Sequence, residues 1–331
     1  MSRALRLSGI LLLALIPANQ ASASSSLFYL EAMGIAGYSS AAHEAIFYSR
    51  TQDESMQKPS LGFDYVLRLS KASGDFALVA VQGRLALNVE GPDRVEFQLF
   101  NAYIKFKTRL ADFWVGHDRP ELGLSSVLDS HAALLQPLAM NGFGFDRDWG
   151  LGLKKDLAWG TAGLALTAGS GMPLELKGNY LVSGRVAWGV LERDNYSLGI
   201  SGAAGRVLDM MGYTLQFPEP LSLALAGLDF SWFWNNVENR FEALAGERSN
   251  GTALGLLWRG GINLLAEGRL KVEVQPAWWK FSPQSFFRLA AGLTYLATPD
   301  ITLRAMYEHD GETRDDRIVL QVYYYKRLPI L

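Results

Sequence analysis

The sequence predicts an all-β protein, a transmembrane antiparallel β-barrel of about 16 strands, with 14 or 18 strands as the alternatives. Three observations support this fold class. Apolar residues recur at every second position over most of the chain, no later stretch has the roughly 18 consecutive apolar residues of a membrane-spanning helix, and aromatic residues gather near the ends of the expected strands. A strand that separates lipid from water must alternate in this way, because successive side chains point to opposite faces of the sheet.

Composition excludes several classes of protein. The chain has 331 residues, of which 49% are hydrophobic and 19% are charged, with 33 glycines, no cysteine and a formal net charge of −2. This balance does not fit a disordered chain or a nucleic-acid-binding domain, and the missing thiols exclude disulfides and cysteine-ligated metals. Charged residues are rarer than the roughly 25% of an average soluble protein, which a membrane-facing surface would explain.

The first residues have the pattern of a secretory signal peptide. Two arginines precede an apolar run at 7–16, and small residues at 21–23 follow a proline, as at a cleavage site. The apolar run is too short to span a bilayer as a helix, which needs roughly 20 residues. We therefore expect a cleaved signal peptide at 1–23 and an exported barrel at 24–331.

Alternation is regular near the C-terminus. Between 315 and 326, Ile318 and Leu320 share one face, while Arg317 and Gln321 share the other. A soluble sandwich would turn its large apolar side chains inward and spread charge outside. Here the face opposite the large apolar residues is small or polar, as a wet lumen requires.

Regular strands account for most of the chain. We expect them at 28–38, 61–70, 76–89, 95–108, 112–118, 145–155, 160–169, 179–190, 195–206, 221–233, 237–247, 252–264, 268–280, 285–297, 300–310 and 315–326. The apolar phase slips by one residue near Phe100 or Asn101 and again near Ala226 and Gly227, and a β-bulge at each place would produce the slip. A barrel of about 16 strands leaves an aqueous lumen.

Aromatic residues are expected to form belts where the barrel wall meets the two membrane surfaces, because Trp and Tyr combine an apolar ring with a polar tip. The candidates are Tyr29, Trp114, Trp149, Trp159, Trp188, Phe230, Trp232, Trp234, Trp258, Trp278, Trp279, Tyr323, Tyr324 and Tyr325. Short connections such as 72–75, 193–195 and 298–300 interleave with longer ones, as periplasmic turns and extracellular loops would.

Alternation stops between 119 and 144. Residues from Leu124 to Leu135 follow helical spacing and Pro137 would end the helix, so we expect a short amphipathic helix there. Loops of this length are usually functional, and in a wide barrel the sharpest hypothesis is that 119–144 folds into the lumen and sets the pore size. The alternative is an external flap.

The segment 95–144 resembles a known family. The runs Phe100-Asn101-Ala102-Tyr103-Ile104 and Phe113 to Gly123 are similar to the strand, turn and strand that precede a long loop in phosphate-selective porins of the O/P type. The matching residues are Gly116, Arg119, Pro120 and Gly123. The resemblance implies a porin, but it implies no phosphate selectivity, since no lysine cluster follows the motif.

The chain carries no recognisable enzyme motif. Its histidines, His43, His117, His131 and His309, form no HExxH pair, and the sequence has no GxSxG. We therefore expect no enzyme activity, no cofactor and no metal. A catalytic triad can assemble from any chain order, so an outer-membrane hydrolase stays as an alternative.

Charged residues on the non-lipid phase of the strands, together with the charges of the long loop, are the candidates for the pore lining. An arginine on the lipid face at mid-depth would cost roughly 2–4 kcal/mol, which favours inward orientation. Rings of such charges select solutes at a narrow aperture. The candidates for pore lining or constriction are Arg84, Glu96, Arg119, Glu121, Asp129, His131, Arg185, Arg288, Arg304 and Glu308.

These observations predict an outer-membrane porin that passes small hydrophilic solutes or ions by diffusion. Its expected partners are outer-membrane lipid and the solutes themselves, without nucleic acid, and a homotrimer is among the assemblies open to it. A second hypothesis is a structural barrel that sheathes a partner such as a multihaem electron-transfer protein. The absence of a haem-attachment motif in the chain permits this alternative without supporting it.

Overall fold

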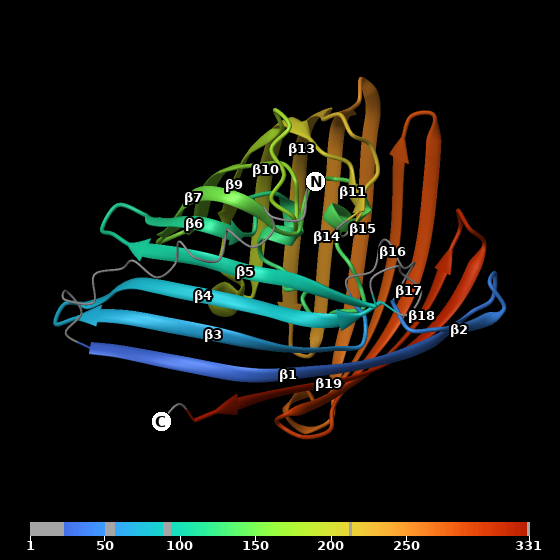
Figure 1. Ribbon diagram of the computed structural model, residues 1–331, viewed down its shortest axis with the longest axis horizontal. Coiled ribbons are helices and arrows are strands. Elements are labelled where there is room, and N and C mark those ends of the chain that lie inside the picture. The colour runs from blue at the N-terminus through green and yellow to red at the C-terminus, as the bar shows by residue number, and fades with distance from the viewer. Residues whose placement is uncertain (1–22, 50–56, 89–93, 212–213, 330–331) are drawn as a thin grey trace.

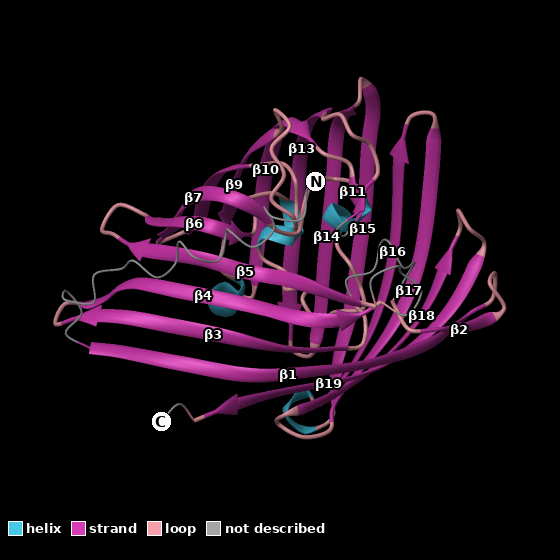
Figure 2. Ribbon diagram, in the orientation of Figure 1, coloured by secondary structure: helices cyan, strands magenta, loops and turns pink. Residues whose placement is uncertain are grey.

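The computed structural model describes residues 23–49, 57–88, 94–211 and 214–329. Apart from residue 23, the expected signal peptide lies outside the described residues. Strands make up nearly all of the described structure, with a few short helices (Figure 2). None of the helices in these residues has the length and hydropathy that a membrane crossing requires.

Sixteen long strands form the wall. They are β1 (Ala23–Ser39), β3 (Ser60–Lys71), β4 (Gly74–Leu87), β5 (Val95–Lys107), β6 (Asp112–Asp118), β7 (Asp148–Leu157), β8 (Gly160–Thr167), β9 (Tyr180–Trp188), β10 (Tyr196–Val207), β13 (Leu221–Trp234), β14 (Val237–Arg248), β15 (Gly251–Leu264), β16 (Leu270–Phe281), β17 (Gln284–Leu296), β18 (Ile301–Asp310) and β19 (Asp315–Leu328). The shorter elements are β2 (Glu44–Ile46), β11 (Met210–Met211), β12 (Thr214–Leu215), η3 (Gly123–Ser126), η4 (Leu138–Asn141), α1 (Leu191–Asp194) and η5 (Ala266–Gly268).

The sheet closes on itself. Each long strand pairs antiparallel with the next along the chain, and β1 pairs with β3 on one side and with β19 on the other. In Figure 1 the blue β1 accordingly runs beside the red β19. The prediction of a closed antiparallel barrel of about 16 strands is confirmed, and the counts of 14 and 18 are excluded.

One of the two expected bulges is present. Between β4 and β5, Gln82 pairs with Asn101 and Gly83 pairs with Leu99, so Phe100 is the extra residue. The second prediction, near residues 226–227, is wrong, because β13 pairs without a shift with both of its neighbours. The apolar phase changes there for another reason, described below with the site.

The alternation separates an outer apolar surface from an inner polar one. On β19, Leu320 is 58% exposed on the outside, whereas Arg317 is 1% exposed on the inside. Large apolar side chains on other strands also point outward and are exposed, for example Leu228 on β13 and Leu256 on β15. The strand phase therefore has the orientation expected of a barrel with lipid outside.

The aromatic belts are only partly as expected. Trp159 and Trp188 stack on the outer surface with ring centroids 5.7 Å apart, as a belt requires. Five of the candidates are wrong, because Tyr29, Trp114, Trp279, Tyr323 and Tyr325 sit on the inner phase of their strands. They pack or hydrogen bond inside the barrel instead.

The two ends of the barrel differ. At one end, the turn end, the connections are short, for example 72–73, 158–159 and 235–236. The opposite end, the loop end, carries the connections 119–147, 168–179 and 208–220. This asymmetry matches the expected distinction between periplasmic turns and extracellular loops.

Candidate functional site: the lumen and the β6–β7 connection

The expected helix in the long loop does not form. The β6–β7 connection, residues 119–147, contains the two 3₁₀ turns η3 and η4 in place of an α-helix over 124–135. A few of its backbone groups bond to one another, as Leu128 N–H does to the carbonyl of Leu124 at 2.8 Å, and several others bond to side chains of the barrel wall. The N–H groups of Leu124 and Leu138 donate to the carboxyl oxygens of Glu242, at 2.8 and 3.3 Å.

More of the backbone of the connection is bound by side chains of the wall. The carbonyl of Leu135 accepts a hydrogen bond from Arg259 at 3.0 Å, and that of Gln136 accepts one from Gln275 at 3.0 Å. A side chain from another connection also takes part, because the amide of Gln57, between β2 and β3, donates to the carbonyl of His131 at 2.8 Å. Backbone N–H and C=O groups that are bound by side chains in this way are not available for the hydrogen bonds of an α-helix.

The first arm of the connection begins with a close approach to the wall. The N–H of Glu121 donates to Ser183 on β9 and that of Gly123 donates to Ser201 on β10, each at 3.1 Å. Gly123 has φ of +53°, and a Cβ added there would lie 2.0 Å from Oε1 of Glu242. Only glycine allows the chain to pass this close to the Glu242 carboxyl group.

Apolar side chains of the connection pack against two successive parts of the wall. Leu122, Leu124 and Phe143 belong to a buried cluster with residues of β9 to β16. Leu134 and Leu135 belong to a second cluster with residues of β1, β2 and β17 to β19. The two clusters lie on different strands, so the residues of the connection between Leu124 and Leu134 must extend from one cluster to the other. This extension also opposes a helix.

The same packing explains the change of phase in β13. Leu223 and Leu225 point inward and are buried in the cluster with Leu122 and Leu124. Toward the turn end, the inward positions become polar with Asp229, and the apolar Leu228 faces out. The inner face of β13 is thus apolar only where the β6–β7 connection covers it.

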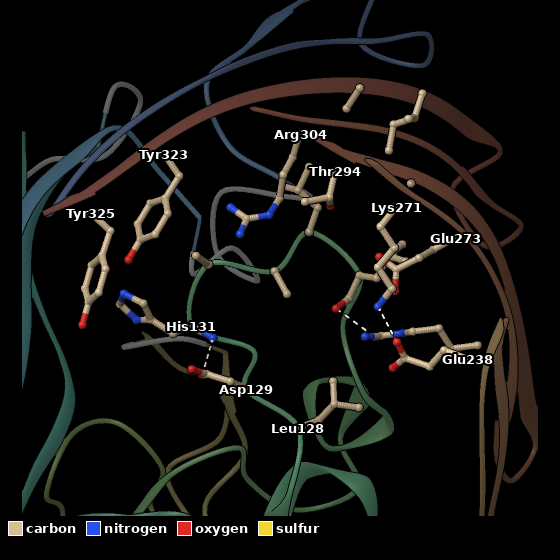
Figure 3. Close-up of a pocket in the computed structure, with 18 of the residues that line it drawn as sticks. Leu128, Asp129, His131, Glu238, Lys271, Glu273, Thr294, Arg304, Tyr323 and Tyr325 are labelled. Carbon is tan, nitrogen blue, oxygen red and sulfur yellow. Dashed lines mark hydrogen bonds and ion pairs between the residues drawn. The ribbon is translucent and has the colours of Figure 1, made fainter. Parts of the chain in front are cut away.

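A cavity of about 570 Å³ lies beside the connection (Figure 3). One side is formed by loop residues, including Asp129, His131 and Leu135, and the rest by inward side chains of the wall. The charged and hydrogen-bonding side chains from the wall are Asp64, Gln82, Asn101, Glu238, Arg240, Arg259, Lys271, Glu273, Thr294, Arg304, Tyr323 and Tyr325. Carboxylates and cations line this lumen cavity together.

Charges of β14 and β16, the two strands on either side of β15, form a network on one side of the lumen cavity. Lys271 Nζ lies 2.8 Å from a carboxylate oxygen of Glu238 and 2.9 Å from one of Glu273. Arg240 contacts the same Glu238 at 2.5 Å. In Figure 3, Glu238, Lys271 and Glu273 lie together, and Tyr323 and Tyr325 lie on the other side of the view.

The tyrosine side of the lumen cavity is fixed by carboxylates. The hydroxyl of Tyr325 donates to Asp64 at 2.7 Å, and that of Tyr323 donates to Glu31 at 3.1 Å. Glu31 also accepts a hydrogen bond from Nε2 of His131 at 2.7 Å. Burial lowers the pKa of His131, and the contact with Glu31 only partly opposes this effect, so the imidazole is neutral at pH 7.

Asp129 is the exposed carboxylate of the connection. Its Oδ1 accepts hydrogen bonds from Arg119 at 2.8 Å and from Arg147 at 3.2 Å, while the side chain is 68% exposed to the lumen cavity. The protein around the carboxyl group opposes its ionisation, but the two arginines outweigh this effect and lower the pKa of Asp129 to about 2. Asp129 therefore stays charged at any pH above about 4.

Three of the ten candidate pore residues line the lumen cavity, namely Asp129, His131 and Arg304. Arg304 donates to Gln321 at 2.7 Å, and its guanidinium carbon lies 5.5 Å from the centre of the Tyr323 ring. Arg119 reaches the cavity through its contact with Asp129. These are the candidates that the fold brings together.

The other candidates are held in the wall or beneath the connection. Arg84 donates to Gln98 at 2.8 Å, and Glu96 pairs with Lys58 at 3.1 Å. Glu121 is 6% exposed, and burial raises its pKa. Their positions are inside the barrel, but they do not line the lumen cavity.

Three further candidates lie in buried ion pairs of the wall. Arg288 lies 2.6 Å from Asp310, and Glu308 lies 3.7 Å from Arg288. Arg185 contacts both oxygens of Asp229, at 2.9 and 2.5 Å. In these pairs the charges compensate each other within the wall.

Sequence reasoning missed most residues of the lumen cavity. Asp64, Glu238, Arg240 and Lys271 were not among the candidates, although strand phase places Glu238 and Arg240 on the same side as Glu242. The spacing of two residues along β14 was the signal that could have found them. In the described part of the chain, no group of His, Asp and Glu side chains could hold a metal ion.

The closed wall and the charged lumen define a class of fold, the porin-type β-barrel of sixteen strands. No family model matches the sequence, and no curated protein matches it. Several solved structures are similar in fold. An anion-selective porin from Comamonas acidovorans has 11% sequence identity and a TM-score of 0.63, over 92% of this chain and 100% of that chain.

Two further solved structures show the same likeness. OmpTdeltaL8, a loop-deletion mutant of an outer membrane protein of Vibrio cholerae, has 10% identity and a TM-score of 0.62, over 92% of this chain and 100% of that one. Salmonella typhi OmpF, solved with daunomycin, has 9% identity and a TM-score of 0.60, over 93% and 99%. At these identities the likeness is one of fold.

Proposed function

We propose that this protein is an outer-membrane porin, a water-filled channel through which small hydrophilic solutes or ions diffuse without a chemical step. The observation that carries the proposal is the lumen cavity, whose lining combines carboxylates, guanidinium groups and an ammonium group inside a wall that is apolar on the outside. Such a lining interacts with hydrated solutes and disfavours apolar ones. The resemblance of 95–144 to phosphate-selective porins supports the same class, and we propose no phosphate specificity.

The β6–β7 connection is proposed as the constriction. It is bound to β9, β10 and β14 on one side and to β15 and β16 further round, so a solute must pass beside it. Its exposed carboxylate, Asp129, faces the lumen cavity between two arginines. Size and charge at this point would set which solutes pass.

The contacts do not favour the alternatives. The connection reaches from Ser201 on β10 to Glu31 on β1 and so fills lumen space that a sheathed partner would need. His117, His131 and His309 hydrogen bond with oxygen atoms of Phe100, Glu31 and Asp316, which is not the serine contact of a hydrolase. A homotrimer in the outer membrane is proposed as the assembly.

Planar-bilayer recordings of the purified protein test the function. We expect stable open steps, and a barrel that inserts and remains silent would contradict the proposal. Deleting residues 124–136 should enlarge the steps, because it removes the segment beside the lumen cavity. Unchanged steps after this deletion would exclude the connection as the constriction while leaving the channel itself in place.

A further inference from the structure

Three methionines meet in a second, smaller cavity at the loop end of the barrel. Met140 comes from the β6–β7 connection, Met172 from the connection 168–179 and Met210 from the connection 208–220. The cavity has a volume of about 80 Å³. Three of the 8 methionines of the chain therefore line one cavity, although they come from three separate connections.

Hydrogen bonds fix the backbones that carry these methionines. The carboxyl group of Asp148 accepts the N–H groups of residues 169–171, at 2.6 to 3.2 Å. The indole of Trp149 donates to the carbonyl of Met172 at 3.0 Å. The N–H of Leu208 donates to the carbonyl of Gly169 at 2.8 Å, which ties the connection that bears Met210 to the one that bears Met172. These hydrogen bonds therefore fix the two connections that carry Met172 and Met210 around the cavity.

The remaining lining is aromatic and acidic. Phe100 and Phe145 contribute rings, and Asp146 and Asp209 contribute carboxylates. Oδ2 of Asp146 contacts Arg147, and Asp209 lies 2.6 Å from Arg248. Asp146 is 9% exposed, and its Oδ1 is buried without a hydrogen-bond partner in the described part of the chain. An unpaired buried carboxylate oxygen is costly unless a donor or a cation completes it.

The size and the donor atoms restrict the occupant. Pockets for organic ligands have volumes of roughly 300–1,000 Å³, so this cavity suits an ion rather than an organic solute. Thioether sulfur is a soft, uncharged donor that favours Cu(I) over hard cations such as Mg²⁺ and Ca²⁺. A monovalent soft ion would also match one carboxylate oxygen that lacks a partner.

We propose that this cavity binds a soft monovalent metal ion of the Cu(I) and Ag(I) class. The thioethers of Met140, Met172 and Met210 are the ligands, and Oδ1 of Asp146, the oxygen of this carboxylate that does not contact Arg147, is a further donor to the ion. Ser130 and Gln136 line this cavity, whereas residues 131–135, which lie between them in the chain, line the lumen cavity. Binding at this site does not depend on conduction, so it goes beyond the porin function.

Methionine NMR with Ag(I) as the probe tests the proposal. The refolded full-length protein, labelled with ¹³C at the methionine methyl groups, is titrated with silver nitrate, and each resonance is assigned from a single Met→Leu variant. The resonances of Met140, Met172 and Met210 should shift together and saturate at one ion per barrel. Met33 and Met306, buried in the wall, should not shift.

Variants separate a metal site from simple packing. Met172→Leu should weaken Ag(I) binding at least tenfold, and Asp146→Asn should weaken it by a smaller factor, while Met306→Leu should bind as the parent does. If methionine only fills space here, as it does in many cores, the three resonances will not respond or will respond at different silver concentrations, and the proposal fails. Bilayer recordings on the same samples report the porin function separately.

Discussion

Oε1 of Glu242, on the inner face of β14, lies 2.8 Å from the backbone nitrogen of Leu124, in the β6–β7 connection. The other oxygen of the same carboxyl group accepts the N–H of Leu138, where the connection returns toward the wall. One buried side chain thus holds both arms of the segment proposed as the constriction. Its removal leaves two N–H groups without acceptors.

Glu242→Ala should therefore loosen the connection. We expect larger and noisier conductance steps, together with a loss of about 2–3 kcal/mol in the free energy of unfolding, from two hydrogen bonds of roughly 1–1.5 kcal/mol each. Bilayer recordings and urea unfolding in detergent measure the two effects. Glu192→Ala, at an exposed position in α1, is the control and should change neither. Steps of parental size and noise from the Glu242 variant would show that the connection does not need this anchor.

Asp129→Asn should shift ion selectivity toward anions. The substitution removes the only carboxylate that the connection exposes to the lumen cavity among the described residues, while Arg119 and Arg147 remain. The reversal potential in a KCl gradient measures the change, with Glu192→Gln as the charge-matched control. A reversal potential equal to that of the parent would mean that ions do not pass Asp129.

The contribution of Asp129 should not depend on pH in the neutral range. Because the pKa of this carboxyl group is lowered to about 2 from an ordinary 3.8, its charge is complete above about pH 4. The favourable interaction with the arginines is present above 3.8 and is lost only as the pH falls from 3.8 toward 2. The difference in reversal potential between the parent and Asp129→Asn should accordingly stay constant from pH 8 to pH 5.

His131 should make the folded state sensitive to mild acid. Its pKa lies below the ordinary 6.5, so the contribution of the neutral imidazole is full above pH 6.5 and is lost as the pH falls through that value. Stability measured by urea unfolding should fall between pH 7 and pH 5, and His131→Gln should flatten this dependence. His43→Gln, at an exposed position, should retain it. Identical pH profiles for the parent and His131→Gln would rule out this origin.

The buried pair of Arg185 and Asp229 should show strong coupling. Both side chains are under 5% exposed, at 4% and 2%, and the guanidinium contacts both carboxylate oxygens. Asp229→Leu leaves a buried guanidinium without its partner and should cost about 3–5 kcal/mol. The double variant Arg185→Leu with Asp229→Leu should recover much of the loss. A double variant whose loss equals the sum of the two single losses would contradict the coupling.

The sequence alone was sufficient for the wall. Alternation placed the long strands to within a few residues, and a one-residue slip located the bulge at Phe100. Both are local patterns, fixed by the two-residue period of a strand against lipid. The same reasoning failed near residue 226, because the inward Leu223 and Leu225 are apolar for a reason that lies in another part of the chain.

The site could be predicted only in part. Sequence spacing suggested a helix in 119–144, but the backbone partners of this segment, such as Arg259 and Gln275, follow more than a hundred residues later. Tyr323 was assigned to a belt on its residue type, whereas its hydroxyl bonds to Glu31 from the far end of the chain. Long-range partners of this kind leave no trace in local periodicity.

The anchoring of the β6–β7 connection has a consequence for the order of assembly. Leu124 and Glu242 are 118 positions apart, and Gln136 and Gln275 are 139 apart, so the segment leaves the ribosome long before the strands that hold it. It can take its final place only after β14 to β16 have joined the sheet. An intermediate with the wall complete and the segment still undocked would have a wider bore than the mature protein, and newly inserted barrels should leak transiently before they settle.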